Sequence, residues 1–186
     1  MSFVSPKTAL ISLSDKSNLE ELVNFLISEN VKILSTGGTY SQIKNITNEV
    51  IEVSEFTGFE EMMDGRVKTL HPKIHAGILA RRDSDMEILK EKNYEPIDLV
   101  VVNLYPFQET IASECSFEEA IEKIDIGGPT MIRAAAKNFK DVVVVSNPND
   151  YKKLIDEWKN DGGISFETRK ILSQKVFALM AEYNRC

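Results

Sequence analysis

The chain has 186 residues, of which 42% are hydrophobic and 27% are charged, and this composition is typical of one globular domain with a substantial core. Its formal net charge of −7 argues against broad binding to nucleic acids, because a duplex partner needs a basic face. No apolar run approaches the roughly 18 residues that span a bilayer, and the N-terminus lacks the basic and apolar regions of a secretory signal.

The first part of the chain alternates short apolar runs with one amphipathic stretch. Thr8–Leu13 predicts a buried parallel strand, and Val31–Leu34 predicts a second strand followed by a short helix through Ile43. Ser17 and Glu20 have the spacing of a capping box, which predicts where the helix between these strands starts. The apolar stripe of that helix consists of Leu19, Leu22, Val23, Leu26 and Ile27.

The middle of the chain carries weaker signals. Val50–Val53 predicts a weak third strand, and Phe56–Met63 predicts a turn with one helical turn. Ile74–Ala80 is largely apolar and is compatible with either a helix or a strand. Asp83–Asn93 predicts a charged, exposed helix.

The clearest buried strand of the sequence is Ile97–Leu104. A helix over Phe117–Ile124 is predicted to be capped by Ser116, with two glutamates in its first turn. Pro129 is then expected at the first position of the next helix, which runs through Lys137.

The last part of the chain predicts one strand and two helices. Val142–Val145 is a buried strand, Pro148 starts a helix, and the final helix covers Phe166–Tyr183. The residues expected to face inward from the final helix are Ile171, Leu172, Val176, Phe177 and Met180. Strands that alternate with helices in this way predict an α/β fold with a mostly parallel sheet.

Polar motifs follow three of the predicted strands. They are Ser14-Asp15-Lys16, Thr36-Gly37-Gly38-Thr39, and Asn103 with Tyr105. Because ligands bind beyond the carboxyl ends of parallel strands, we expect all three to face one crevice. The first two motifs offer hydroxyl groups and free backbone N–H groups to an anion. The competing interpretations are helix caps for the first motif, a tight turn for the second, and a cap on the core for Tyr105.

The stretch Gly65–His75, here called the cationic loop, fits neither a strand nor a helix pattern. Arg66 and Lys68 suit an anionic ligand, although a solvated charge cluster is the alternative. His71 and His75 have the spacing of a metal pair, but Pro72 stands between them and no H-E-x-x-H motif is present. We therefore predict no metal, and expect His71 to hold the loop by hydrogen bonds.

Asp125 and Lys137 lie on either side of the Gly127-Gly128-Pro129 break. If the loop turned the Asp toward the crevice, the two side chains could form a proton relay. For an arbitrary Asp and Lys, a structural ion pair or two solvated charges is the better interpretation.

Six segments, taken together, resemble a known protein family, although no single motif among them is specific enough to identify it. They are Ser12–Lys16, Ser35–Thr39, Arg66–Pro72, Asn103–Phe107, Ile124–Gly128 and Arg133–Asn138. In order, they closely resemble the IMP cyclohydrolase domain of the AICAR transformylase/IMP cyclohydrolase bienzymes. The resemblance implies a three-layer, methylglyoxal-synthase-like fold with a mostly parallel central sheet covered by helices on both faces. It also implies closure of the purine ring of 5-formamidoimidazole-4-carboxamide ribotide (FAICAR) to give IMP and water, the last step of de novo purine biosynthesis.

The resemblance further implies a role for each matching residue. The catalytic group would be Lys68, Tyr105, Asp125 and Lys137, in which Lys137 with Asp125 would move protons. Lys68 and Tyr105 would polarise or orient the formyl and carboxamide groups. The substrate-binding residues would be Ser12, Ser14, Lys16, Thr36, Gly37, Gly38, Thr39, Arg66, Thr69, Asn103, Ile126 and Gly127.

The likeness covers residues 1–186 as one cyclohydrolase domain and lacks the family's C-terminal transformylase domain, so we expect either a cut-out domain or a stand-alone enzyme. A cytoplasmic homodimer that acts on a small purine nucleotide is expected, with no cofactor, nucleic acid or membrane partner. In a full-length protein the transformylase domain would be the covalent partner. The two distant cysteines, Cys115 and Cys186, fit a reducing compartment.

Two other classes of protein share this fold. One is a non-catalytic nucleotide-sensing module, and the other is methylglyoxal synthase, a lyase. Phosphate-binding loops alone would fit all three functions. The segments Arg66–Pro72 and Ile124–Lys137 favour the cyclohydrolase.

Overall fold

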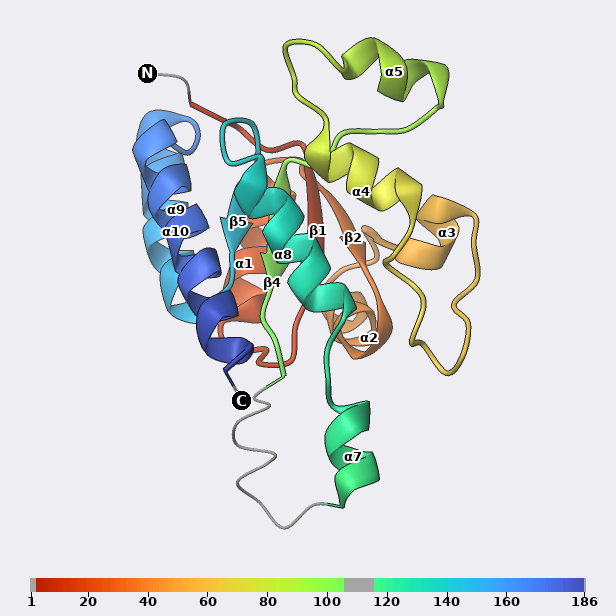
Figure 1. The fold of residues 1–186 in the computed structure, drawn as a ribbon. Coiled ribbons are helices and arrows are strands. Elements are labelled where there is room, and N and C mark those ends of the chain that lie inside the picture. The colour runs from red at the N-terminus through yellow and green to blue at the C-terminus, as the bar shows by residue number, and fades with distance from the viewer. Residues whose placement is uncertain (1–2, 106–115, 186) are drawn as a thin grey trace.

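The computed structural model describes residues 3–105 and 116–185, and within them a five-stranded parallel sheet forms the centre (Figure 1). The strand order is β3-β2-β1-β4-β5. The strands are β1 (Thr8–Ser12), β2 (Lys32–Ser35), β3 (Val50–Glu52), β4 (Leu99–Val102) and β5 (Val143–Val145). Each of the five predicted strands overlaps one of these strands, because a run of branched side chains suits a strand buried on both faces.

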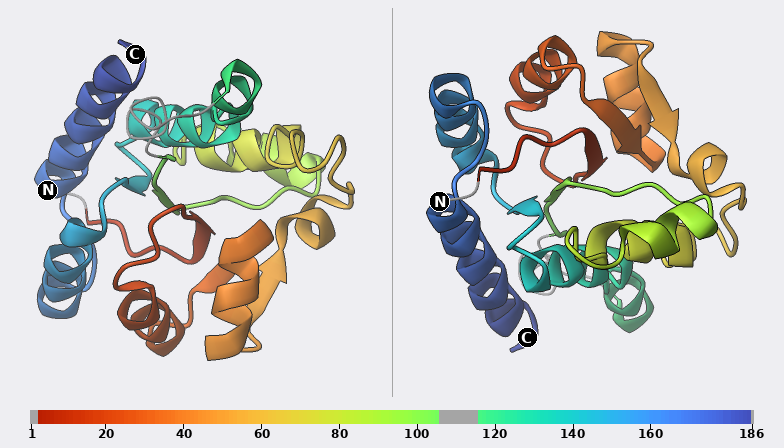
Figure 2. Two further views of the ribbon diagram at one scale, coloured as in Figure 1. Left: turned by 90° about the horizontal axis from the view of Figure 1, so that it is seen from below. Right: turned by 90° about the horizontal axis from the view of Figure 1, so that it is seen from above.

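Helices cover both faces of the sheet, as the two end-on views show (Figure 2). One face carries α1 (Leu19–Ser28), α2 (Gly37–Ile46) and α9 (Tyr151–Asp161). The other face carries α4 (Pro72–Leu79), α8 (Gly127–Lys137) and α10 (Phe166–Tyr183). The remaining short helices are α3 (Val53–Thr57), α5 (Met86–Glu91), α7 (Phe117–Glu122) and the 3-10 helix η1 (Pro148–Asp150). The three-layer α/β prediction is therefore confirmed, and no helix in the described part of the chain could cross a membrane.

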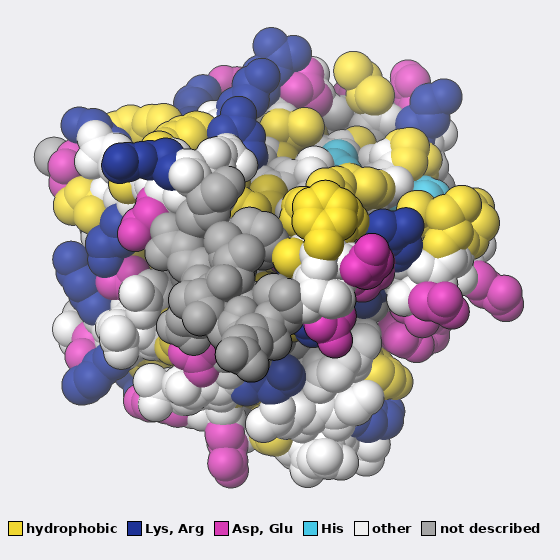
Figure 3. Space-filling view, turned by 60° about the horizontal axis from the view of Figure 1, so that its bottom comes forward, with side chains coloured by type: hydrophobic (Ala, Val, Ile, Leu, Met, Phe, Trp, Pro, Cys, Tyr) yellow, Lys and Arg dark blue, Asp and Glu magenta, His cyan; other side chains and the backbone are white. Residues whose placement is uncertain are grey.

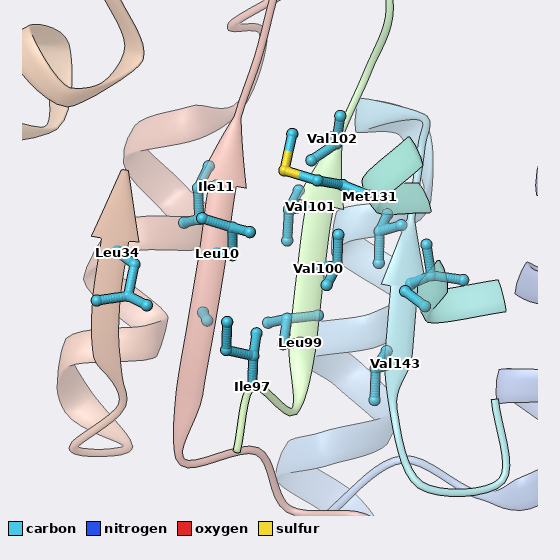
Figure 4. Packing of buried hydrophobic residues seen from close by; sticks show 14 of the residues in the cluster. Leu10, Ile11, Leu34, Ile97, Leu99, Val100, Val101, Val102, Met131 and Val143 are labelled. Atoms are coloured by element: carbon cyan, nitrogen blue, oxygen red, sulfur yellow. The ribbon is translucent and has the colours of Figure 1, made fainter. Parts of the chain in front are cut away.

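The core lies between the sheet and its two helical layers. Leu10 and Ile11 on β1 pair in register with Val100 and Val101 on β4, and all four are completely buried. Figure 4 shows Met131 of α8 lying beside Val101 and Val102. This packing fixes the carboxyl ends of β1 and β4 and the first turns of α8 relative to one another.

The start of α1 differs from the prediction. Its N-cap is Asn18, with a left-handed φ of 60°, and no side chain caps the helix. The Ser17 hydroxyl instead donates to Asp15 Oδ1 at 2.6 Å, and the Ser17 N–H donates to the same oxygen at 2.9 Å. The capping box of Ser17 and Glu20 is wrong because the Asp15 carboxylate is a charged acceptor that engages Ser17 first. The capping box of Ser116 and Glu119 on α7 does form.

Four other predicted elements are corrected or resolved. The ambiguous Ile74–Ala80 is helical within α4, and the predicted Asp83–Asn93 helix shrinks to α5. The helical turn predicted within Phe56–Met63 lies earlier in the chain, because α3 ends at Thr57, before Gly58. Pro129 is the third residue of α8, which begins two residues earlier at Gly127.

The prediction of which α10 residues face inward is only partly correct. Leu172, Val176 and Met180 are buried, but Ile171 and Phe177 are 36% and 45% exposed. The buried face includes Arg169 instead, which is completely buried. Its guanidinium donates to the carbonyl oxygens of Phe139 at 2.9 Å and Lys140 at 3.0 Å, and also to that of Ile164. Arg169 thereby joins α10 to the loop between α8 and β5.

Replacing Arg169 by Met is expected to lower the free energy of unfolding by about 3–5 kcal/mol, because several buried carbonyl groups lose a charged donor. Urea unfolding followed by circular dichroism measures this change. Lys170→Met is the matched control, since Lys170 is the exposed neighbour on the same helix. Equal stability of the two variants would contradict the anchoring role of Arg169.

Candidate functional site

A cavity of about 370 Å³ lies beyond the carboxyl ends of β1, β2 and β4, where the strand order reverses. Its walls come from the ends of these strands, the start of α2, the cationic loop and the segment that leads into α8. The volume suits a small organic ligand. The expectation that the strand-end motifs face one crevice is confirmed.

The structure brings together most of the predicted site residues. Every residue predicted to bind substrate lines the cavity, namely Ser12, Ser14, Lys16, Thr36, Gly37, Gly38, Thr39, Arg66, Thr69, Asn103, Ile126 and Gly127. Of the predicted catalytic group, Lys68, Tyr105 and Asp125 line it as well. The neighbouring Pro106 and Phe107 of the matched motif lie outside the described residues, as do Cys115 and Cys186.

Lys137 is the predicted residue that the structure places elsewhere. It is exposed at the last position of α8, whereas the cavity lies at the first turns of that helix. Gly127 and Lys137 are the first and last of the 11 residues of α8, which places them about 15 Å apart along the helix. Arg133, midway between them, is exposed too. The predicted relay between Asp125 and Lys137 is therefore wrong within a single chain, because a continuous helix keeps the two apart.

Two of the predicted binding residues hold the walls of the cavity in place. The Thr39 hydroxyl accepts from the Leu13 N–H at 2.9 Å and donates to the Leu13 carbonyl at 3.1 Å. Asn103 Oδ1 accepts from the N–H groups of Ser14 and Asp15, and Asn103 Nδ2 donates to the Asp15 carbonyl at 2.7 Å. The only proton of the Thr39 hydroxyl is thus already used. Thr39 and Asn103 shape the loop after β1, and the other groups are left to meet a ligand.

The N-terminus of α2 forms one wall. Gly37 has a φ of 57°, a left-handed conformation that favours glycine, and Gly38 has open space where a side chain would be. The first backbone N–H groups of a helix have no partner within it, and they carry the positive end of the helix dipole. This wall can therefore accept a phosphate group at close approach to the backbone.

Lys68 lies between the other walls of the cavity. Its ammonium nitrogen is 3.5 Å from the position that a side-chain carbon would take at Gly37, and equally far from that position at Gly65. Its charge also lowers the pKa of Asp125, against the larger effect of burial. A side-chain carbon at either glycine would be in ordinary van der Waals contact with the ammonium group. Lys68 is thus placed between the N-terminus of α2 and the Asp125 carboxylate.

Asp125 lies at the entrance to α8. Its Oδ1 accepts from the Gly128 N–H at 2.9 Å. Burial raises the pKa of Asp125 above its ordinary value of 3.8, although the Gly128 N–H and Lys68 act in the opposite direction. A half-buried carboxyl with a raised pKa is a candidate for a group that moves a proton.

The raised pKa of Asp125 predicts how stability depends on pH. A carboxyl with a higher pKa in the folded protein than in the unfolded chain destabilises the fold when ionised, so its contribution falls as the pH rises above 3.8. Asp125→Asn should therefore raise the free energy of unfolding at pH 7 by about 1 kcal/mol. The gain should shrink as the pH approaches 3.8.

Urea unfolding of Asp125→Asn at several pH values measures this effect. Glu49→Gln removes an exposed carboxylate from a loop and serves as the control. A destabilised Asp125→Asn variant at pH 7 would show that the carboxylate supports the fold.

Several residues of the cavity wall escaped the sequence analysis. Lys123 lies 5.7 Å from the centre of the Tyr105 ring, and Glu122 lies 3.4 Å from Arg66. Both Arg66 and Glu122 are about 60% exposed, so their ion pair is weak and leaves Arg66 available to a ligand. Glu122 is the last residue of α7 and Lys123 is its C-cap, and the end of an ordinary charged helix gives no local signal. Gly128, by contrast, stood within the matched motif Ile124–Gly128.

The cavity favours an anion although the chain is acidic. Its wall carries the cations Lys16, Arg66, Lys68 and Lys123 against the acids Asp64, Glu122 and Asp125. The N-termini of α2 and α8 add the positive ends of two helix dipoles. Elsewhere on this side of the molecule, Figure 3 shows acidic and basic side chains interspersed. The described wall of the cavity therefore has a small excess of cationic side chains.

The two histidines support the cationic loop. His71 is the N-cap of α4, and its Nδ1 accepts from the Lys73 N–H at 3.1 Å, as expected for a residue that holds the loop. His75 interacts with the backbone of Thr69, and burial lowers its pKa. Within residues 3–105 and 116–185, no three His, Cys, Asp or Glu side chains cluster closely enough to hold a metal ion.

Comparison with known proteins gives two family matches. The MGS-like domain family matches residues 18–130, and the AICARFT/IMPCHase bienzyme family matches residues 135–186. The chain is 56% identical over 180 residues to a bifunctional purine biosynthesis protein PurH of Clostridium botulinum (strain Eklund 17B / Type B). It is 54% identical over 180 residues to PurH of Fusobacterium nucleatum subsp. nucleatum.

Both PurH alignments cover 96% of this chain and 36% of the relative, so the chain spans about a third of the length of these proteins. A solved structure, that of ForH, is 34% identical with a TM-score of 0.82. That match covers 99% of this chain and 96% of ForH.

Proposed function

This chain belongs to the family of MGS-like domains, and from this premise we propose that it is an IMP cyclohydrolase that closes the purine ring of FAICAR. The observation that carries the proposal is the placement of Lys68, Tyr105 and Asp125 around one cationic cavity. The likeness to PurH and to the IMPCHase family supports it independently. Nothing in the proposal requires a cofactor.

The phosphate of the nucleotide would bind at the N-terminus of α2. The N–H groups of Gly37 and Gly38 would donate to it, with Ser14, Lys16 and Thr36 beside them. Thr39 and Asn103 would act indirectly by holding the loop after β1. Arg66 and Thr69 would flank the rest of the nucleotide. This arrangement fixes one end of the substrate, so that its reacting groups meet in an attack geometry.

Ring closure joins the carboxamide nitrogen to the formyl carbon of the same molecule. As the C–N bond forms, the carboxamide nitrogen loses a proton, which Asp125 would accept, and the formyl oxygen becomes an oxyanion. Lys68 and the Gly127 N–H at the start of α8 would stabilise that oxyanion. The oxyanion then takes the proton from Asp125 and becomes a hydroxyl group. The C–O bond breaks and this group leaves as water with the proton of the former formamide nitrogen, as a C=N bond forms between that nitrogen and the former formyl carbon. Tyr105 would orient the carboxamide group.

The surroundings of the enzyme are also part of the proposal. We infer a cytoplasmic homodimer, and in a full-length protein a transformylase domain as the covalent partner. The bifunctional name of the PurH relatives and their greater length support that partner. Lys137 would keep a catalytic role only if it reached the cavity of the second chain, because its own cavity lies at the opposite end of α8.

Ultraviolet absorbance during incubation with FAICAR tests the proposal, because closing the purine ring changes the spectrum. We expect the spectrum of IMP to appear with the wild-type chain. Binding of IMP without any spectral change would favour a nucleotide-sensing module. Turnover of dihydroxyacetone phosphate would instead indicate a methylglyoxal synthase.

A further inference from the structure

The segment that carries Asp125 has few contacts of its own with the core. The preceding helix α7 has no buried residue, and it projects from the body of the molecule (Figure 1). On either side of Asp125, the side chains of Ile124 and Ile126 are 47% and 57% exposed. Local packing therefore holds this segment only weakly, and its position depends on hydrogen bonds.

One of these hydrogen bonds comes from a distant part of the chain. The Asp125 backbone N–H donates to the hydroxyl oxygen of Tyr183 at 2.9 Å, across 58 residues of sequence. Other hydrogen bonds near Asp125 are short-range, such as the bond from Gly128 N–H to its carboxylate and that from Ile124 N–H to the Ile121 carbonyl. Tyr183 thus links the segment around Asp125 to α10, which contributes no residue to the cavity wall.

That element is rigidly placed. Tyr183 is the last residue of α10, whose buried Arg169 donates to carbonyl groups of the loop between α8 and β5. The Ser173 hydroxyl donates to the Ala136 carbonyl at 2.8 Å, and Met180 is buried one turn before Tyr183. From Arg169 to Tyr183 the helix extends about 21 Å. The tyrosine hydroxyl is therefore presented to Asp125 from a well-packed helix.

We propose that Tyr183 is a positioning residue for ring closure, because its hydroxyl fixes the Ile124–Asp125 peptide and with it the direction of the Asp125 carboxylate. This role rests on the proposed cyclohydrolase function. Tyr183 does not line the cavity, so it acts through Asp125 and not on the substrate. Holding a catalytic group to within a fraction of an ångström requires such support.

Tyr183→Phe removes the hydroxyl and keeps the ring. We expect kcat for FAICAR to fall about tenfold or more, since a misplaced catalytic group loses attack geometry. KM should stay within about twofold, because the groups that bind the phosphate are untouched. Tyr94→Phe is the matched control, as Tyr94 lies outside the cavity wall, and it should leave kcat unchanged.

A double-mutant cycle with Asp125→Asn separates positioning from a general loss of structure. If Tyr183 acts through Asp125, Tyr183→Phe should have little further effect on the residual kcat of Asp125→Asn. Hydrogen exchange at the Asp125 amide should accelerate about fivefold in Tyr183→Phe, the effect of losing one ordinary hydrogen bond.

If the wild-type chain converts FAICAR, any one of three results would contradict the proposed role of Tyr183. They are an unchanged kcat in Tyr183→Phe, an unchanged exchange rate at the Asp125 amide, and an undiminished effect in the Asp125→Asn background. If the wild-type chain does not convert FAICAR, the proposed function itself is wrong, and the role of Tyr183 in ring closure is then wrong as well.

Discussion

Lys68→Met should lower kcat for FAICAR ring closure by about 100- to 1,000-fold, the effect typical of losing one donor that stabilises an oxyanion. The Lys68 ammonium lies against Gly37 and Gly65, and its charge acts on Asp125. Among the described residues, Lys68 is the cation that both lies beside Gly37 at the N-terminus of α2 and acts electrostatically on Asp125. Methionine keeps the length of the side chain and removes only its charge and its donors.

Steady-state kinetics and IMP binding together test this expectation. Binding of IMP should weaken by less than about tenfold, because the N–H groups of α2 remain. Lys44→Met, an exposed lysine on α2, is the control and should match the wild type. A Lys68→Met enzyme with wild-type kcat would remove the lysine from the chemistry.

Gly128→Ala should reduce turnover by about 100-fold through a steric effect on Asp125. An added side-chain carbon would lie 2.4 Å from Asp125 Oδ2 and 2.7 Å from Leu104 Cδ2. Both distances are far below van der Waals contact, so the Asp125 carboxylate has to move. The same hydrogen bond that now holds the carboxylate, from the Gly128 N–H, would be distorted.

Turnover and thermal unfolding of Gly128→Ala should be compared with those of Pro129→Ala. Pro129 occupies the same turn of α8 but is not part of the cavity wall. The expected pattern is a large loss of kcat for Gly128→Ala alone, with a cooperative melt for both. Retained turnover in Gly128→Ala would show that the position of Asp125 is not critical.

The sequence predicts the frame of this protein well because the frame depends on local patterns. The predicted runs Ile97–Leu104 and Val142–Val145 contain the branched side chains of Leu99–Val102 and Val143–Val145, which form buried strands. The rule that ligands bind beyond the carboxyl ends of parallel strands then brings the strand-end motifs together. Arg66 and Lys68 were assigned to the site from the charge of their loop and from family resemblance.

The features of the site that the sequence does not predict depend on contacts between segments that are distant in the chain. Nothing local shows that the Thr39 hydroxyl is committed to the Leu13 backbone, or that Tyr183 reaches the Asp125 amide. The pairing of Asp125 with Lys137 failed for a related reason, since spacing in sequence does not show that an unbroken helix separates the two. Competing hydrogen bonds likewise removed Ser17 from its predicted cap.

A crystal structure of the chain with IMP bound is the most direct test of the proposed site. The expected result is a phosphate at the N-terminus of α2, against Gly37 and Gly38, with the six-membered ring of the purine between Lys68 and Asp125. A nucleotide bound outside this cavity, or bound in it with the purine turned away from both Lys68 and Asp125, would contradict it.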